Sequence, residues 1–345
     1  MSGCRHKSNK QSTLRTNIRV QRDDVTEAAY GVLAVTRSKP LLLIKDRMPS
    51  LPWQPVVNDA EHRCFAYVLR QADSPLSEVQ LREWFMELHP RNYTSKGGGN
   101  GAGAGDGKAG APEAWTDAVH AGETLLRRTS WCTFAPGCVC AYGYADTWQP
   151  IAQHVSFRAA LLRITRAIEG VCALPAGTFN SVNLNWYPVG GGVGFHADDE
   201  FLFDGLRRDV TIISLSLCEE GGAGGTGTRR FQIRAKQPLA LHGEDGVSDN
   251  CGGIGGEGCG DGGSSENPRI DCTGVCGVDL RHGDLMTMEG LHQLFLLHAV
   301  WPGDRQDQQG HPHTRGERIN LTFRTITRHL DGSHECRGVR CPLAG

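Results

Sequence analysis

The sequence predicts a mainly β fold, a jelly roll or barrel flanked by helices. The main observation is a series of short apolar runs, broken by turn-forming residues, in the second half of the chain. No helical pattern intervenes between these runs, so an antiparallel closed architecture is favoured over a parallel sheet. The runs are 182–187, 210–217, 230–234, 237–241, 278–280, 284–288, 294–300 and 318–326.

Apolar residues at helical spacing precede the β-rich region. One such pattern follows Asp59 and another follows Ser77, and together they predict an N-terminal helical layer. Their apolar positions are Phe65, Val68 and Leu69 in the first pattern and Leu81, Trp84, Phe85 and Leu88 in the second.

Two further elements are expected in the middle of the chain. Residues 129–144 mix β-forming side chains with a Pro136-Gly137 turn, which predicts a hairpin. An amphipathic helix is expected to begin near Ser156 and to end at Gly170. Its apolar face consists of Phe157, Ala160, Leu161, Ile164 and Ile168.

Glycine is concentrated in three tracts of the chain, 97–110, 221–227 and 243–277. Outside these tracts glycine usage is ordinary, so the sequence predicts a folded protein that carries flexible segments. The expected regions are a basic disordered arm (1–22), an N-terminal helical region (23–95), a Gly-rich linker (96–113), a main domain (114–330) with Gly-rich loop insertions at 219–228 and 242–277, and a tail (331–345).

Composition narrows the class of protein. The 13 cysteines are an odd number and no secretory signal is evident, which favours a reducing intracellular compartment over a disulfide scaffold. No apolar run approaches the roughly 20 residues that span a bilayer, so no membrane partner is expected. The net charge of −2 excludes a strongly cationic body. The basic arm leaves three interpretations open, namely a phosphate-binding segment, an organellar transit peptide or a solvated terminus.

A candidate metal site begins at His196 and Asp198. Because residues two apart on a strand face the same side, the imidazole and the carboxylate can converge on one ion. A second copy of the pattern, His282-Gly-Asp284, shows that it is weak by itself. A later His298 in an apolar run strengthens the first copy. Two histidines and one carboxylate form the facial triad of non-haem Fe(II) oxygenases, whose open positions take a 2-oxo acid and O₂.

The last apolar run alternates polar and apolar side chains. Its apolar face consists of Ile319, Leu321 and Phe323, and its polar face of Arg318, Asn320, Thr322 and Arg324. Arginines that face the interior of a β-sandwich need an anion, and a dicarboxylate suits the bidentate guanidinium fork.

From about Thr129 to Arg328 the chain resembles the AlkB family of Fe(II)/2-oxoglutarate-dependent nucleic-acid dealkylases, in particular the eukaryotic members that repair N-alkylated bases. Several short motifs occur in the family's order. The matching runs are 179–187, 196–200, 214–217, 229–234, 282–290, His298 and 318–324.

The resemblance implies a double-stranded β-helix (jelly-roll) oxygenase core. It implies oxidative dealkylation of bases in DNA or RNA, with release of formaldehyde and conversion of 2-oxoglutarate and O₂ to succinate and CO₂. The implied Fe(II) ligands are His196, Asp198 and His298. The implied 2-oxoglutarate contacts are Asn185, Tyr187, Asn320, Arg324 and, on the distal carboxylate, Arg318. The implied substrate contacts are Trp131 stacking on the extruded base, Tyr142 on a phosphate, and Glu200, with Asp199, beside a cationic base.

Several alternatives stay open at the level of sequence. DNA repair is favoured, with single strands somewhat preferred, but an RNA demethylase fits the same motifs. So does an oxygenase that acts on a protein or small molecule, and a non-catalytic nucleic-acid binder is a further alternative. A monomer in the nucleus is expected, with cytoplasm or mitochondrion as the alternative locations.

The cysteines and the C-terminal region raise a separate question about zinc. Four potential donors lie near the C-terminus, although their spacing does not match the common structural zinc patterns. They are His329, His334, Cys336 and Cys341. Three earlier cysteines, Cys132, Cys138 and Cys140, are expected to be ordinary buried thiols.

Overall fold

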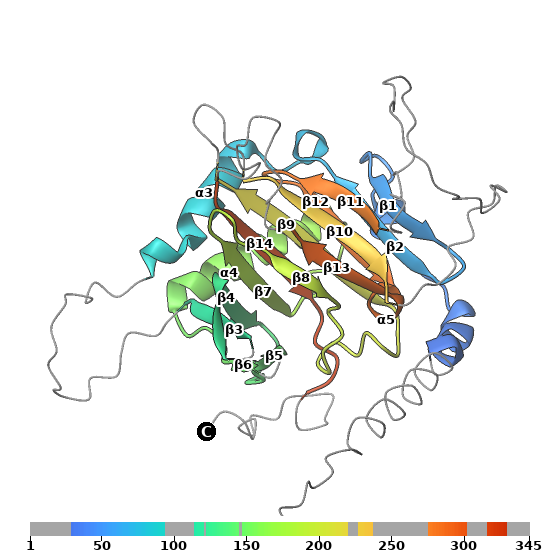
Figure 1. Ribbon diagram of the computed structural model, residues 1–345. Coiled ribbons are helices and arrows are strands. Elements are labelled where there is room, and N and C mark those ends of the chain that lie inside the picture. The colour runs from blue at the N-terminus through green and yellow to red at the C-terminus, as the bar shows by residue number, and fades with distance from the viewer. Residues whose placement is uncertain are drawn as a thin grey trace, which may run out of the picture.

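Two antiparallel β-sheets lie face to face in the computed structural model, with helices on the outer face of the larger sheet (Figure 1). The structure describes residues 29–93, 114–120, 122–144, 147–219, 227–236, 275–301 and 316–329. This arrangement confirms the predicted jelly-roll class.

The sheets draw their strands from distant parts of the chain. In spatial order the larger sheet consists of β1 (Gln54–Asp59), β2 (Cys64–Leu69), β12 (Leu285–Gly290), β9 (Val210–Cys218), β14 (Arg318–Arg324), β7 (Ser181–Tyr187), β4 (Glu123–Thr133) and β3 (Thr116–His120). The smaller sheet consists of β11 (Val275–Leu280), β10 (Arg229–Ala235), β13 (Leu296–Val300) and β8 (Val193–His196). A separate pair is formed by β5 (Tyr142–Tyr144) and β6 (Thr147–Gln149).

Short and long helices complete the described part of the chain. The α-helices are α2 (Ile44–Arg47), α3 (Glu78–Leu88), α4 (Val155–Val171) and α5 (His292–Phe295), and two 3₁₀ turns span Gln71–Asp73 and Pro90–Asn92. Residues 29–37 are also helical. Among the described residues, no helix combines the length and apolarity needed to cross a membrane.

The predicted helices at Ser77 and Ser156 are confirmed by α3 and α4. The Ser77 hydroxyl caps α3 by accepting a 3.2 Å hydrogen bond from the Gln80 amide. Both helices bury their apolar stripes against the larger sheet, where they meet the apolar face of β14. The polar face of β14 is therefore turned to the space between the sheets.

The helix expected after Asp59 is wrong, because this region forms the β1–β2 hairpin. Strand β2 pairs with β12, with Cys64 opposite Gly290 and Leu69 opposite Leu285. Nearly every β2 side chain is buried. The sequence of a strand that is covered on both faces is a continuous apolar run. Such a run includes apolar residues three and four positions apart, which is also the spacing expected of a helix.

The hairpin expected over 129–144 is also wrong in its pairing. The turn at Pro136-Gly137 is present, with the Cys138 amide bonded to the Ala135 carbonyl at 3.1 Å. Strand β4, however, pairs with β3 and β7, whereas β5 pairs with β6. The chain therefore leaves the larger sheet at this turn.

The other predicted runs are strands, with one modification. Residues 294–300 divide between the end of α5 and strand β13. The run 237–241 lies outside the described residues, as do the arm, the linker and most of the Gly-rich insertions.

The second His-Gly-Asp copy forms a tight turn before β12. Gly283 has a φ of 77°, a backbone conformation that suits glycine. The buried Asp284 carboxylate accepts hydrogen bonds from the amides of Gln71 (3.1 Å) and Arg281 (2.9 Å) and pairs with Arg70 at 2.7 Å. Asp284 thus ties this turn to the start of the N-terminal helical region.

Asp284→Ala is expected to lower the free energy of unfolding by about 2–4 kcal/mol, because two partly buried amide donors lose their buried acceptor. The ion pair adds less, since Arg70 keeps contact with water. Denaturant unfolding measures the loss, and metal analysis of the folded protein should find the iron content unchanged. Loss of iron with no loss of stability would contradict a purely structural role.

Candidate active site

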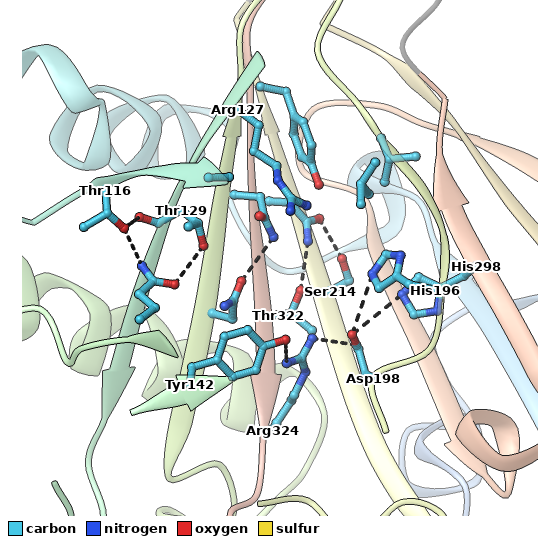
Figure 2. Close-up of a pocket in the computed structure, with 18 of the residues that line it drawn as sticks. Thr116, Arg127, Thr129, Tyr142, His196, Asp198, Ser214, His298, Thr322 and Arg324 are labelled. Atoms are coloured by element: carbon cyan, nitrogen blue, oxygen red, sulfur yellow. Dashed lines mark hydrogen bonds and ion pairs between the residues drawn. The ribbon is translucent and has the colours of Figure 1, made fainter. Parts of the chain in front are cut away.

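His196, Asp198 and His298 meet between the two sheets. His196 ends β8 and His298 lies opposite it on β13, so sheet pairing brings the two imidazoles together. The ligand atoms of the three residues lie within 4.8 Å of one another. Asp198 Oδ1 is 3.8 Å from His196 Nε2 and 3.9 Å from His298 Nε2 (Figure 2). The three residues predicted as a metal triad therefore converge on one point.

The two imidazoles are held with Nε2 directed at that point. His196 Nδ1 donates to the Gly194 carbonyl at 2.9 Å, so in the neutral ring Nε2 carries the lone pair. The ring of His298 stacks on Phe231, with centroids 5.4 Å apart and planes at 15°. Burial lowers the pKa of both histidines. Neutral imidazoles are the form that binds a metal.

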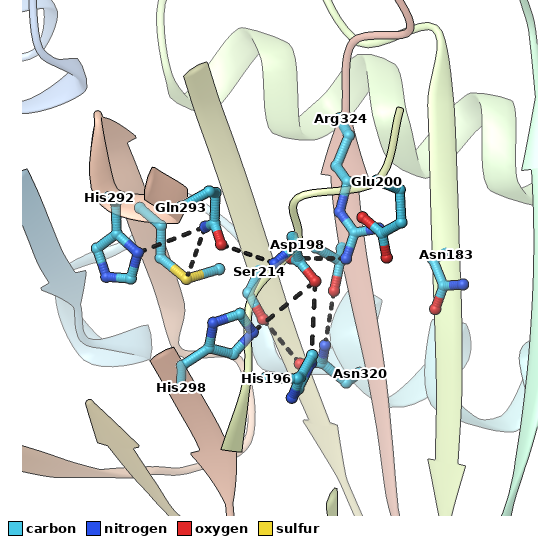
Figure 3. A network of polar contacts seen from close by, with 12 residues as sticks. Asn183, His196, Asp198, Glu200, Ser214, His292, Gln293, His298, Asn320 and Arg324 are labelled. Carbon is cyan, nitrogen blue, oxygen red and sulfur yellow. Dashed lines mark hydrogen bonds and ion pairs between the residues drawn. The ribbon is translucent and has the colours of Figure 1, made fainter. Parts of the chain in front are cut away.

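Asp198 is the anionic member of the triad. Its backbone amide donates to Gln293 Oε1 at 2.8 Å, and its Oδ2 lies 2.6 Å from Arg324 Nη2 (Figure 3). Burial opposes ionisation, but Arg324 and the two imidazoles outweigh it and lower the pKa of Asp198. One carboxylate oxygen thus faces the imidazoles while the other is fixed by a guanidinium.

A cavity of about 280 Å³ opens beside the triad. Among the residues predicted to bind 2-oxoglutarate, Asn185, Tyr187, Asn320 and Arg324 line it. Its remaining walls come mainly from β3, β4, β6 and β9. The cavity therefore joins the predicted metal ligands to four of the five predicted co-substrate residues, whereas Arg318 does not line it.

Arg318 has the environment of an anion-binding residue. Its side chain is fully buried, and Nη2 donates to Ser216 Oγ at 2.9 Å and to Asn320 Oδ1 at 2.8 Å. Nε and Nη1 are buried with no hydrogen-bond partner in the described part of the chain. A buried guanidinium with two unused donors is costly unless an anion accompanies it. The site thus fits one carboxylate of a dicarboxylic acid.

Arg324, which was also predicted to contact 2-oxoglutarate, already has partners within the protein. It lines the cavity, but its guanidinium is already engaged by Asp198 and, at 3.1 Å, by the Tyr142 hydroxyl. In this arrangement Arg324 orients the triad carboxylate.

Glu200 lies in a polar network next to the triad. Tyr142 donates a short hydrogen bond to Glu200 Oε1, and Oε2 is buried with no hydrogen-bond partner among the residues described. Burial, reinforced by the charge of Asp198, raises the pKa of Glu200 to about 7. This network joins the Glu200 carboxylate to the cavity-lining ring of Tyr142.

Two predicted substrate residues lie elsewhere. Asp199 points to Lys236, with which it forms a 2.8 Å ion pair, so it does not accompany Glu200. Trp131 is fully buried, stacks on Tyr142 at 5.1 Å, and donates to the Cys140 carbonyl. Trp131 therefore packs against the cavity-lining ring of Tyr142 and does not itself line the cavity.

Two cavity residues were missed by the sequence interpretation. Arg127 lines the cavity and is 7% exposed, whereas its neighbour Arg128 forms an outer ion pair with Asp117. Because successive side chains on a strand face opposite sides, Arg127 on β4 faces the cavity and Arg128 faces away from it. Trp148 on β6 also lines the cavity and is 45% exposed, so it is the aromatic ring accessible at this wall.

A second cluster of potential metal ligands lies apart from the triad. Cys138, Cys140 and His329 come together, and both cysteines are buried thiols outside any disulfide, as expected. Cys132 does lie in the apolar core under α4. The other predicted C-terminal donors, residues 334, 336 and 341, lie outside the described residues.

The jelly-roll fold, the His-Asp-His cluster and the cationic pocket define a class of protein, the non-haem iron oxygenases that use a 2-oxo acid. Residues 115–324, more than half of the chain, match the 2OG-Fe(II) oxygenase superfamily. The chain belongs to this superfamily and is an Fe(II)- and 2-oxoglutarate-dependent dioxygenase.

Solved structures with a similar chain path are distant in sequence. The structure of OsALKBH1 shares 16% identity over 75% of this chain and 97% of its own, with a TM-score of 0.38. A 2OG-Fe(II) oxygenase family oxidoreductase from Burkholderia pseudomallei shares 9% identity over 61% of this chain and 71% of its own, with a TM-score of 0.30. No curated protein matches the sequence.

Proposed function

We propose that this oxygenase removes alkyl groups from N-alkylated bases of DNA or RNA, with single strands favoured. The observation that carries the proposal is the buried Glu200 carboxylate, held by Tyr142 beside the triad with Oε2 unused. N1-methyladenine and N3-methylcytosine are cations, and a carboxylate in a low-dielectric wall favours them over uncharged bases. The adjacent aromatic rings suit a planar ligand.

In this proposal His196, Asp198 and His298 hold Fe(II). The donor set fits iron because two neutral imidazoles and one carboxylate leave positions open for co-substrate and O₂. When bound, iron and 2-oxoglutarate supply the oxidation of the N-alkyl carbon, after which formaldehyde leaves. Arg324 keeps Asp198 ionised and oriented.

The 2-oxoglutarate site follows the polar face of β14. Arg318 takes the distal carboxylate with its unused Nε and Nη1 donors. Asn185, Tyr187 and Asn320 line the path from there to the triad. Together these residues would hold the co-substrate next to the triad.

A base taken out of the stack would enter past Trp148 and Tyr142. Trp148 offers an exposed ring for stacking, and Arg127 adds a positive charge to the same cavity for a backbone phosphate. The protein's own task is to hold the alkylated nitrogen near the metal and to exclude water.

The deciding experiment is an assay of formaldehyde and succinate with a panel of methylated oligonucleotides, single- and double-stranded, DNA and RNA, in the presence of iron and 2-oxoglutarate. Both products should form in equal amounts with at least one N-methylated oligonucleotide. Succinate formation that no oligonucleotide stimulates would instead favour an oxygenase acting on a protein or small molecule.

Glu200→Gln is expected to lower the preference for a cationic methylated base over an uncharged one by about tenfold or more. The glutamine keeps the shape and the acceptor for Tyr142 but removes the charge. The preference is measured as the ratio of kcat/KM for N3-methylcytosine and N3-methylthymine in the same oligonucleotide. Asp199→Asn is the matched control, because Asp199 pairs with Lys236 and should leave the ratio unchanged.

A further inference from the structure

Cys138, Cys140 and His329 form a compact cluster of soft ligands on the outer side of the Tyr142 wall. Both sulfur atoms lie close to the same imidazole nitrogen, with His329 Nδ1 at 3.6 Å from Cys138 Sγ and at 3.5 Å from Cys140 Sγ. All three side chains are buried, and neither cysteine is part of a disulfide. The cluster is therefore shielded from water and available for a ligand.

The distances agree with those of a tetrahedral zinc site. Zinc lies about 2.3 Å from a thiolate sulfur and about 2.05 Å from a histidine nitrogen, so a tetrahedral angle separates sulfur and nitrogen by about 3.6 Å. The two sulfur–nitrogen distances match this value. A weak thiol–imidazole hydrogen bond has a similar length, which makes metal content the decisive measurement.

The chemistry of the donors separates this cluster from the triad. Two thiolates and one imidazole select zinc, whereas two imidazoles and one carboxylate with open positions suit Fe(II). The triad and the cluster share no residue. The protein can therefore hold zinc at the cluster and Fe(II) at the triad at the same time.

The cluster also joins two segments that form the cavity wall. Cys140 precedes Tyr142 by two residues, and its carbonyl accepts the Trp131 indole N–H at 2.9 Å. His329 follows β14, the strand that carries Arg324. A metal at this place would fix the Trp131–Tyr142 stack against the end of β14, close to Glu200.

We propose that Cys138, Cys140 and His329 bind a structural zinc ion that clamps the β4–β5 connection to the segment after β14. Structural zinc sites are almost always four-coordinate. The three described donors therefore leave one position of a structural zinc site to a further ligand.

The test uses the full chain with His196→Ala and His298→Ala, so that the proposed iron site cannot retain zinc. Elemental analysis after dialysis should find one zinc per chain. Adding Cys138→Ser and Cys140→Ser should lower the zinc content by about tenfold or more, whereas Cys132→Ser, the matched buried thiol, should not. His329→Cys should retain zinc because it restores a ligand.

Cobalt substitution provides a second readout, which can be measured on the chain with both cysteines and His329 intact. The Co²⁺-loaded protein should show thiolate-to-metal charge-transfer absorption, which His329→Cys strengthens and Cys138→Ser weakens. A chain without zinc and without this absorption would overturn the proposal. So would zinc that stays at one per chain when both cysteines are replaced.

Discussion

His298→Ala is expected to abolish iron-dependent turnover of 2-oxoglutarate. Outer-shell partners of a metal ligand commonly contribute about 10–100-fold to affinity or activity, so loss of a ligand itself should exceed this range. His298 is buried, stacked on Phe231 and aimed at Asp198. Succinate formation and iron content should fall together.

The matched control is a buried histidine with an unrelated role. His62 is 7% exposed and pairs with Asp59 at 2.8 Å, and it does not line the cavity. His62→Ala should retain both iron and succinate formation, within the limits of its stability. Full iron content in His298→Ala, measured on the folded protein, would contradict the assignment of this ligand.

Alternation within a strand is the part of the site that sequence predicts well. The polar and apolar faces of β14 follow directly from the two-residue period: Asn320, Thr322 and Arg324 line the cavity, whereas Arg318 is buried beside Asn320. The same rule, applied to β4, would also have separated Arg127 from Arg128. Where residues leave regular strands, as Asp199 and Glu200 do, the period no longer applies.

Pairings between distant segments are what sequence alone could not predict. The continuous apolar run of β2 does not say that it adjoins β12 more than 200 residues later. Likewise, Cys138 and Cys140 gain chemical meaning only because the chain after β14 returns to them. Closure of such long loops has a cost that rises slowly with length, so no local signal marks it.

The stacking of Trp131 on Tyr142 illustrates the limit of assigning roles by residue type. A tryptophan in this region can line a cavity or support its wall, and the choice depends on which ring lies in front. The exposed aromatic is Trp148, in a short strand that the sequence interpretation did not identify.

Arg318→Met is expected to weaken 2-oxoglutarate binding on the order of 100-fold or more, because truncating one partner of a buried charge pair costs about 2–5 kcal/mol. The same substitution should leave the free energy of unfolding of the ligand-free protein unchanged or higher. Replacing a buried charge by an apolar side chain of similar size is commonly neutral or stabilising, and Arg318 has no carboxylate partner among the described residues.

The free energy of unfolding, measured with and without 2-oxoglutarate, distinguishes a ligand-binding role of Arg318 from a structural role. At a ligand concentration of 100 times its Kd, 2-oxoglutarate should stabilise the unsubstituted chain by about 2.7 kcal/mol. The same concentration should have little effect on Arg318→Met, and Arg318→Lys should restore only part of the effect because a point charge replaces the bidentate fork. If Arg318 were a structural residue, the substitution would instead destabilise the ligand-free chain and leave the remaining response to 2-oxoglutarate intact. The two unused donors at Nε and Nη1 favour the first outcome.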